Sequence, residues 1–390
     1  MIQIIHPADC CGCSACASVC AHQAITMQPD ALGFLYPVVD TDKCTQCGLC
    51  ERVCAFHPDY DKSLNLPQPI AFGARHKDMH EVATSRSGAA FIAMSDYVLE
   101  QGGVVYGAGY AEHFRVVHKR AITKMQRDEF KGSKYVQSDL EDTFRQVKKD
   151  LKAGLTVLFS GTPCQTAGLH SYVGEKLRAN LILVDIVCHG VPSPHIWNDY
   201  LCYLERESHA EVVHVDFREK AQCGWQAHKE AFKYVGRENE TDIRDSYTHL
   251  FYKHIMFRHS CGECKYTNLQ RPSDVTLADF WGWQKTHATI NADDQGLSLV
   301  LCNTTKGLSL FETVKEQMHV FPAKIEDCMQ PNLRCSSSIH PSRIQFEQDY
   351  TRKGFEYILH RYGNKGWRYQ IEKYTAKVKR AINRIIARKP

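Results

Sequence analysis

The chain has 390 residues, 18 of them cysteines, and a formal net charge of +4. This length allows two or three domains with a large core. So small a charge argues against nucleic acid as the main partner. No run of 18 apolar residues occurs, so we expect no membrane-spanning helix. The first residues lack the charged and apolar regions of a signal peptide. Many cysteines without a predicted leader indicate a reducing compartment, and we expect a cytoplasmic protein.

Two four-cysteine runs occupy the first 54 residues, each spaced C-x2-C-x2-C-x3-C. They consist of Cys10, Cys13, Cys16 and Cys20, and of Cys44, Cys47, Cys50 and Cys54. In this pattern three cysteines of a run hold one 4Fe-4S cluster and the fourth holds the other cluster. The expected ligand sets are Cys10, Cys13, Cys16 and Cys54 for the first cluster, and Cys44, Cys47, Cys50 and Cys20 for the second. Residues 1–60 thus resemble the two-cluster bacterial ferredoxin module.

Zinc and disulfides are the alternatives for these cysteines. Zinc sites usually pair C-x2-C knuckles and lack the third and fourth cysteines seen here. Disulfides need an oxidising compartment. Ala21 and Ala55 follow the two runs, where ferredoxins usually have proline, so the loops lose some rigidity but no ligand. Cys11 is a spare thiol that we interpret as a bystander.

Short elements and a linker complete the N-terminal part. Residues 24–27 and 34–38 predict a hairpin beside the first cluster. Residues 61–69 form a polar linker that contains proline.

From Ile70 onward, apolar strands alternate with helices. Strands are predicted at 70–75, 104–110, 116–122, 155–160, 180–187, 274–280 and 297–303, and helices at 87–99, 139–152, from 165 onward and at 307–320. Ser87 is the expected N-cap of the first helix. A hairpin is expected over residues 212–217 and 228–235. The alternation predicts an α/β domain with a sheet buried on both faces, after an α+β ferredoxin-like domain.

The last stretch, residues 336–390, is predicted to be mostly helical and basic at its end. Its final helix either packs on its own domain or contacts anionic lipid or an acidic partner protein.

Four later cysteines form a candidate third site. Cys164 and Cys188 follow predicted strands, at the sheet edge where open α/β sheets bind ligands. Cys261 and Cys264 form a C-x2-C pair, so the four thiolates suit a 4Fe-4S cluster or zinc. The other cysteines, Cys202, Cys223, Cys302, Cys328 and Cys335, show no partner spacing and are interpreted as packing residues.

A protein that carries single electrons needs a converter to two-electron chemistry, and a flavin is the usual one. No G-x-G-x-x-G follows a strand, so a Rossmann site is not indicated. Residues 85–88 (SRSG) and 131–135 (KGSKY) are candidate phosphate or flavin cradles, because helix-start amides and lysines attract anions. Both segments also fit plain loops.

Several segments resemble the beta subunit of coenzyme F420 hydrogenase/dehydrogenase, in the bacterial form with an N-terminal ferredoxin module. They are Ser87-Gly88, 131–136 (KGSKYV), 161–165 (GTPCQ), 188–193 (CHGVPS), 217–220 (FREK) with Gly224-Trp225, 261–264 (CGEC) and 278–282 (ADFWG). The likeness runs over about residues 1–335. Ala89 departs from the pattern, because a second glycine is common there, and its methyl group crowds the phosphate approach.

The resemblance implies an iron–sulfur flavoprotein oxidoreductase. It implies FAD at Ser87, Gly88, Lys131, Gly132, Ser133, Lys134 and Tyr135, with Thr162 and Asp279 as further contacts. It also favours a third cluster on Cys164, Cys188, Cys261 and Cys264. His189 is a candidate proton donor, or else a loop histidine bonded to backbone. Asp279 orients a ligand or a ribityl hydroxyl, or caps a turn.

The expected organisation is a ferredoxin-like domain (1–60), a linker (61–69), an FAD-binding α/β domain (70–335) and a helical basic extension (336–390). The expected function is electron transfer between 4Fe-4S clusters and an organic two-electron substrate through FAD. The redox partner is a protein such as ferredoxin or another oxidoreductase subunit. Two alternatives stay open: an electron-transfer subunit without its own substrate site, and a zinc-stabilised binding protein. The resemblance does not establish the deazaflavin coenzyme as substrate.

Overall fold

The computed structural model describes residues 1–57, 65–286 and 289–367, together with residues 369, 371, 373 and 375. The α-helices are α1 Ala15–Val19, α2 Leu49–Arg52, α3 Met79–Thr84, α4 Ala90–Glu100, α5 Lys124–Asp128, α6 Thr143–Lys152, α7 Pro163–Val173, α8 Pro194–Ser208, α9 Ser246–Tyr252, α10 Thr305–Val314, α11 Ile325–Cys328 and α12 Arg343–Arg361. The strands are β1 Ile25–Pro29, β2 Leu35–Val39, β3 Ile70–His76, β4 Val104–Tyr110, β5 Val116–Ala121, β6 Val157–Gly161, β7 Leu181–Ile186, β8 Val212–Asp216, β9 Glu230–Tyr234, β10 Asp242–Arg244, β11 Val275–Asp279, β12 Ser298–Cys302 and β13 Met318–Ala323.

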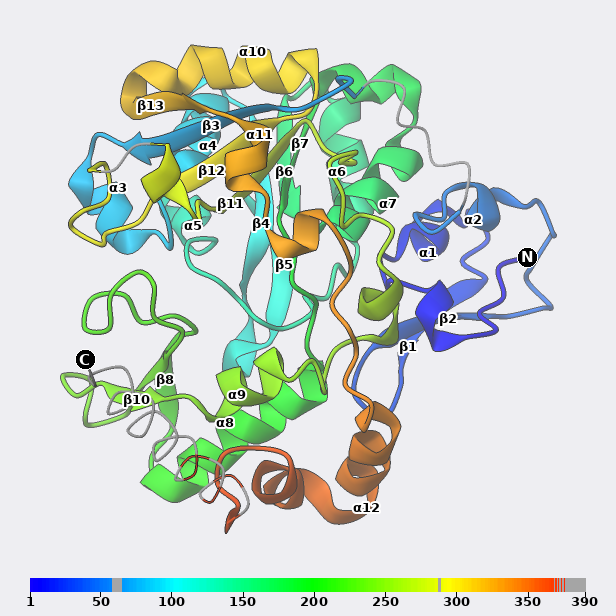
Figure 1. Ribbon diagram of the computed structural model, residues 1–390. Coiled ribbons are helices and arrows are strands. Elements are labelled where there is room, and N and C mark those ends of the chain that lie inside the picture. Colours follow the sequence, from blue (N-terminus) through cyan, green and yellow to red (C-terminus); the bar gives the residue numbers. More distant parts are fainter. Residues whose placement is uncertain are drawn as a thin grey trace.

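The centre of the molecule is an eight-stranded mixed sheet in the order β13-β3-β12-β11-β7-β6-β4-β5. Strands β4, β6, β7 and β11 run parallel, and the flanking strands pair antiparallel. Helices α4 and α10 cover one face, where Met94 and Phe311 pack with Leu158 and Val184 (Figure 1). Helices α6 and α7 cover the other face through Phe144 and Leu169. Apolar residues on both faces therefore hold the predicted α/β sheet in place.

The ferredoxin-like part, drawn in blue at one side of Figure 1, packs onto α6 and α7 rather than onto the sheet. Cys11, Ala15 and Val53 share one apolar cluster with these two helices. Strands β1 and β2 form the predicted hairpin. Helices α6 and α7 thus lie between the sheet and the N-terminal cysteines.

A third layer closes the molecule below the sheet in Figure 1. It consists of the antiparallel sheet β10-β9-β8 with α8, α9 and α12, packed around Trp197, Tyr247 and Phe346. Phe34 at the tip of the N-terminal hairpin reaches into this cluster. The predicted hairpin over residues 212–235 is confirmed by the pairing of β8 with β9.

Two local predictions were wrong. The N-cap of α4 is Ala89, and the Ser87 hydroxyl instead donates to Leu297 O at 2.7 Å. The helix predicted over 307–320 ends at Val314, and residues 318–323 form β13 at the sheet edge, because they pair with β3.

Residues 61–64 of the predicted linker and 376–390 of the predicted basic extension lie outside the described residues. In the described part, no helix is long and apolar enough to cross a membrane.

Candidate functional site

The first predicted ligand set comes together around α1. The pKa of the Cys16 thiol is raised by burial and by the neighbouring sulfurs of Cys13, Cys10 and Cys54. Cys54 comes from the second run, beyond α2, and packs with Cys16 in the same apolar cluster. The fourth cysteine of one run therefore lies beside the first three of the other, as the interlocked pattern predicts.

The second predicted set lies toward the surface. Cys47 is exposed, whereas Cys44 and Cys20 are half-buried and Cys50 is buried. Cys50 Sγ accepts from the Ile2 amide at 3.4 Å, and Cys20 Sγ accepts from the Ala24 amide at 3.3 Å. Of the two N-terminal cysteine groups, this one therefore has the more direct route to solvent.

The third predicted set is assembled from three distant segments. Cys188 follows β7, and Cys164 stands in the first turn of α7, just after β6. Strands β6 and β7 are parallel neighbours, so both thiols meet at one edge of the sheet. The loop with Cys261 and Cys264 closes on them, since burial and then the sulfurs of Cys261, Cys164 and Cys264 raise the pKa of Cys188.

The donor chemistry of these groups fits iron–sulfur clusters. Each group consists of thiols that accept hydrogen bonds from backbone amides. Gly12 N lies 3.4 Å from Cys10 Sγ, and Val191 N lies 3.4 Å from Cys261 Sγ. Such amide bonds stabilise thiolate sulfur and tune cluster potentials. Among the described residues, no three His, Cys, Asp or Glu side chains converge closely enough to hold a single metal ion.

Cys11 lies between the first and third groups and is more than a bystander. It is buried, and the neighbouring sulfurs of Cys13 and Cys164 raise the pKa of its thiol. The two groups are close because Gly168 of α7 has no side chain, and a Cβ there would stand 2.7 Å from Cys13 Sγ. The packing of α7 therefore brings the N-terminal cysteines next to the thiols at the sheet edge.

A cavity of about 400 Å³ opens at the same sheet edge. Its lining includes eight of the nine residues predicted to bind FAD: Ser87, Lys131, Gly132, Ser133, Lys134, Tyr135, Thr162 and Asp279. Cys188 and His189 line it as well. The size lies within the usual range for cofactor sites.

Gly88, the ninth predicted residue, is not part of the cavity lining and packs against the backbone of the neighbouring strands. A Cβ there would collide with Ala74 O and stand 2.6 Å from Ser298 N, so glycine lets this loop lie against β3 and β12. The next residue, Ala89, has φ 61°, a left-handed conformation that glycine adopts more readily. Helix α4 begins directly after it, so its first amides lie beside the cavity.

The lysines of the second predicted segment differ in their surroundings. Lys131 Nζ lies 2.7 Å from Glu81, so its charge is paired. Lys134 donates to Lys131 O at 2.9 Å, and burial lowers its pKa to about 8. Tyr135 stacks on Phe251 with ring centroids 4.5 Å apart. This segment therefore offers one half-buried cation and one aromatic face to a ligand.

Two arginines also line the cavity: Arg86, from the predicted SRSG cradle, and Arg218, which the sequence did not single out as a ligand residue. Arg218 forms an ion pair with Asp279, and Arg86 donates to backbone oxygens of Arg218 and Trp225. Asp279 also accepts from Trp225 Nε1 at 3.2 Å, so it orients this wall. Within the described residues, Arg86 Nε, Arg218 Nε and Ser85 Oγ are buried without a hydrogen-bond partner. Orphaned donors beside a cavity suit an anionic ligand.

His189 lies between the thiols and the aromatic end of the cavity. Its Nε2 is 2.7 Å from His254 Nε2, and burial lowers its pKa to about 4. His228 also lines the cavity, and burial and then Arg218 lower its pKa to about 4. Both imidazoles are therefore neutral at pH 7, and each can hold a single exchangeable proton.

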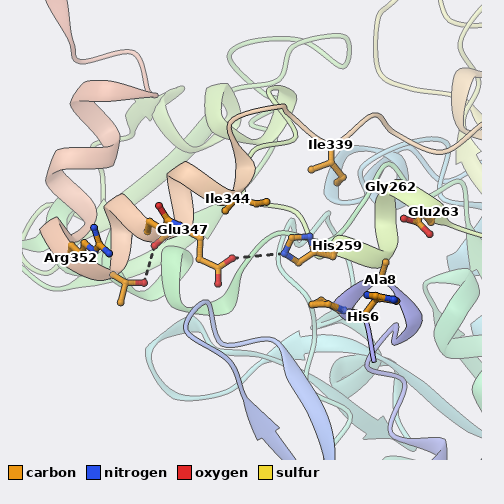
Figure 2. A pocket seen from close by; sticks show the side chains of 12 residues that line it. His6, Ala8, His259, Gly262, Glu263, Ile339, Ile344, Glu347 and Arg352 are labelled. Atoms are coloured by element: carbon orange, nitrogen blue, oxygen red, sulfur yellow. Dashed lines mark hydrogen bonds and ion pairs between the residues drawn. The ribbon is translucent and has the colours of Figure 1, made fainter. Parts of the chain in front are cut away.

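A second, open depression of about 820 Å³ lies outside the thiols, among the first residues of the chain, the Cys261 loop and α12. Figure 2 shows Glu347 of α12 directed toward His259, with Glu347 Oε2 3.9 Å from His259 Nε2. The neighbouring His259 and a hydrogen bond of 2.7 Å from Arg343 lower the pKa of Glu347 to about 2. Helix α12 therefore holds the loop that carries Cys261 and Cys264.

Comparisons with known proteins agree with this arrangement. Residues 154–327 match the family model for the C-terminal part of the beta subunit of coenzyme F420 hydrogenase/dehydrogenase. This stretch of the chain is similar to that beta-subunit family. Residues 9–57 match the 4Fe-4S dicluster domain, so the chain carries an N-terminal cluster-binding domain. The two matches indicate an iron–sulfur electron-transfer protein that is similar to this beta-subunit family.

No curated protein sequence matches the chain. Among solved structures, the F420-reducing NiFe hydrogenase complex from Methanosarcina barkeri, from a xenon derivatization study, is similar with a TM-score of 0.45 and 15% identity. That match covers 74% of this chain and 89% of the other.

Proposed function

We propose that this beta-subunit relative is an iron–sulfur flavoprotein oxidoreductase. It passes electrons between three 4Fe-4S clusters and an organic two-electron substrate through FAD. The flavin, when bound, supplies the exchange between one-electron and two-electron chemistry. The free thiols of all 18 cysteines suit a reducing compartment, and we place the protein in the cytoplasm.

One observation carries the proposal: Cys188 belongs both to the third thiol group and to the lining of the cavity. A cluster on Cys164, Cys188, Cys261 and Cys264 would be adjacent to a flavin held by the predicted residues. Cys11 joins this group to the first one. Electrons that enter at the exposed Cys47 would then pass from the second cluster to the first, the third and the flavin.

The residues of the cavity have separable tasks. Arg86 and Arg218 attract the anionic part of the cofactor, because each keeps a buried, unpaired N–H in the described structure. The first amides of α4 add a partial positive charge. His189 holds a proton at one nitrogen and exchanges it with His254 through the 2.7 Å contact. It therefore positions a proton beside the cavity without carrying a charge at pH 7.

The partner is a redox protein that meets the surface around Cys47. This cysteine is the exposed member of the second group, and Cys44 beside it is half-buried. An electron carrier that docks here would approach the second cluster more closely than either of the others.

The direct test is to purify the protein without oxygen and count iron and released flavin. We expect about 12 iron atoms per chain, as three four-iron clusters require, and one FAD. In the Cys261→Ala variant the iron content should fall by about one third, because one of three clusters is lost. FAD should stay bound, because Cys261 does not line the cavity.

The matched control is Cys202→Ala, which removes an exposed cysteine of α8 outside the three groups. It should keep all the iron. About eight iron atoms without flavin, as two four-iron clusters require, would instead favour an electron-transfer subunit with no substrate site. Zinc without visible absorbance would contradict both redox functions.

A further inference from the structure

Arg258 is a fully buried guanidinium between the first and third thiol groups. Its side chain is 0% exposed, and it precedes Cys261 by three residues. It reaches the first group, since Nη2 lies 3.5 Å from Cys10 Sγ and Nε donates to Cys10 O at 2.8 Å. Nη2 also donates to Leu35 O at 2.9 Å, and Nη1 donates to Gln137 Oε1 at 3.0 Å. One side chain thus links the loop of the third group to the backbone around the first.

The position of this guanidinium is fixed. The Tyr36 ring lies against it, with the centroid 4.1 Å from Cζ. On another side, a Cβ on Gly12 would stand 2.8 Å from Nη1, so the glycine backbone packs directly on the charge. A cation held this rigidly acts on its neighbours with a constant field.

Arg258 is unusual among the buried arginines because none of its described partners is a carboxylate. Arg271 is equally buried and pairs with Asp185 at 3.0 Å, and Arg127 pairs with Asp96 at 2.6 Å. The acceptors of Arg258 are backbone oxygens, one amide and one cysteine sulfur. An isolated buried charge is costly unless opposite charge surrounds it.

Cysteine sulfurs supply that opposite charge. Cys10 Sγ lies 3.5 Å from Nη2, and the Cys261 amide donates to Arg258 O at 3.0 Å. On the side of the third group, the Arg258 amide donates to Val191 O at 3.0 Å, and the Val191 amide donates to Cys261 Sγ at 3.4 Å. The cation therefore interacts with ligands proposed for two different clusters, whereas no described contact joins it to the second group near the surface.

We infer that Arg258 is a positioning residue that raises the reduction potentials of the first and third clusters above that of the second. The part concerning the third cluster rests on the proposed function; the part concerning the first does not. A nearby cation stabilises the reduced form of a cluster, which carries one more negative charge. Electrons that enter at the second cluster are then drawn inward, away from the exposed Cys47.

The test is a redox titration with mediators, followed by electron paramagnetic resonance of each cluster. In Arg258→Gln we expect lower midpoint potentials for the first and third clusters and an unchanged potential for the second. In Arg258→Lys, which keeps the positive charge, the midpoint potentials of the first and third clusters should stay close to those of the wild type. Full iron content with unchanged potentials in Arg258→Gln would overturn the inference and leave Arg258 a purely structural residue.

Two further variants keep the inference testable if Arg258→Gln fails to load iron. Gln137→Glu places a carboxylate beside Nη1 and partly neutralises the cation, so the same two potentials should fall; unchanged potentials would contradict the inference. Arg127→Gln is the control, since it removes a buried arginine that pairs with Asp96 on the opposite face of the sheet. All three potentials should stay as in the wild type. Iron and FAD counts on the wild type separately decide the proposed function.

Discussion

His118, in the lining of the cavity, shows how one residue makes the stability of the fold depend on pH. The imidazole is buried, and its ring stacks on Phe159 with centroids 5.0 Å apart. Nε2 lies 3.0 Å from Ser160 O, while Nδ1 has no hydrogen-bond partner in the described part of the chain. Burial lowers the pKa of His118 from 6.5 to about 4. The folded protein therefore keeps this side chain neutral.

Between pH 6.5 and about 4, the unfolded chain binds a proton at His118 that the folded chain does not bind. Stability is thus complete above pH 6.5 and falls as the pH decreases through this window. We expect the wild type to lose more unfolding free energy between pH 7 and pH 5.5 than His118→Gln does. Denaturant unfolding under anaerobic conditions measures both. Equal losses in the two proteins would exclude His118 as a source of the pH dependence.

At the same scale, Ala89 shows what a sequence pattern conveys and what it leaves out. A glycine is common at this position, and the structure gives the reason in a positive φ of 61°. The pattern suggested crowding of a phosphate, whereas the backbone conformation at the start of α4 is the constraint that the structure reveals.

Among the elements, strand predictions were the more accurate, because each buried strand is a short apolar run bounded by polar residues. Strand β4 was predicted with the observed bounds. Strand β13 was missed, since His319 and Pro322 break its apolar pattern and only pairing with β3 makes it a strand. Local sequence patterns could not predict the order of the strands in the sheet either, because β3, β12 and β13 join the central strands from distant parts of the sequence.

Some residues of the candidate site could be predicted from local sequence, and others depend on the tertiary fold. The two N-terminal ligand sets follow from spacing, because the ligands of a run lie within one short loop and one turn of helix. Cys164 and Cys188 could be placed at one sheet edge from the strands before them. Cys261 and Cys264 were added to this site from ligand count and from the resemblance, because no local pattern shows that their loop, next to Glu347 of α12 through His259, folds onto the sheet edge. Arg258 gave no local signal at all, because only the tertiary fold brings it to Cys10.

Helix α7 is the element that sets the distance between the first and third thiol groups. Gly168→Ala would place a Cβ 2.7 Å from Cys13 Sγ, inside the normal contact distance. We expect this variant to lose up to about one third of its iron, the share of one cluster among three. Iron analysis and paramagnetic resonance of the reduced protein measure the loss. Ser171→Ala on the same helix is half-buried and should keep its iron; an unaffected Gly168→Ala would mean that α7 and the module can move apart.

At the scale of the molecule, the N-terminal module is built into the rest of the chain. Its backbone oxygens accept from side chains far along the sequence: Arg145 donates to Ala17 O at 2.8 Å, and Ser193 donates to Leu32 O at 2.5 Å. Tyr266 donates to Ala55 O as well. Phe34 and Val53 meanwhile lie in cores that the later helices complete. The module is therefore held to the rest of the chain by contacts along its whole length, in addition to the linker.

This attachment predicts how the protein behaves when its chain is cut. A protease site introduced within residues 65–69, in the polar and Pro-bearing segment before β3, should allow cleavage with little loss of structure. We expect the module to stay bound to the remainder in gel filtration and to keep its cluster absorbance. Because the buried guanidinium of Arg258 and the apolar contacts both hold the two pieces together, separation should require denaturant. Protein without the introduced site is treated identically as the control. Elution of a free coloured module after cleavage would show that the linker, and not the interface, keeps the clusters beside the cavity.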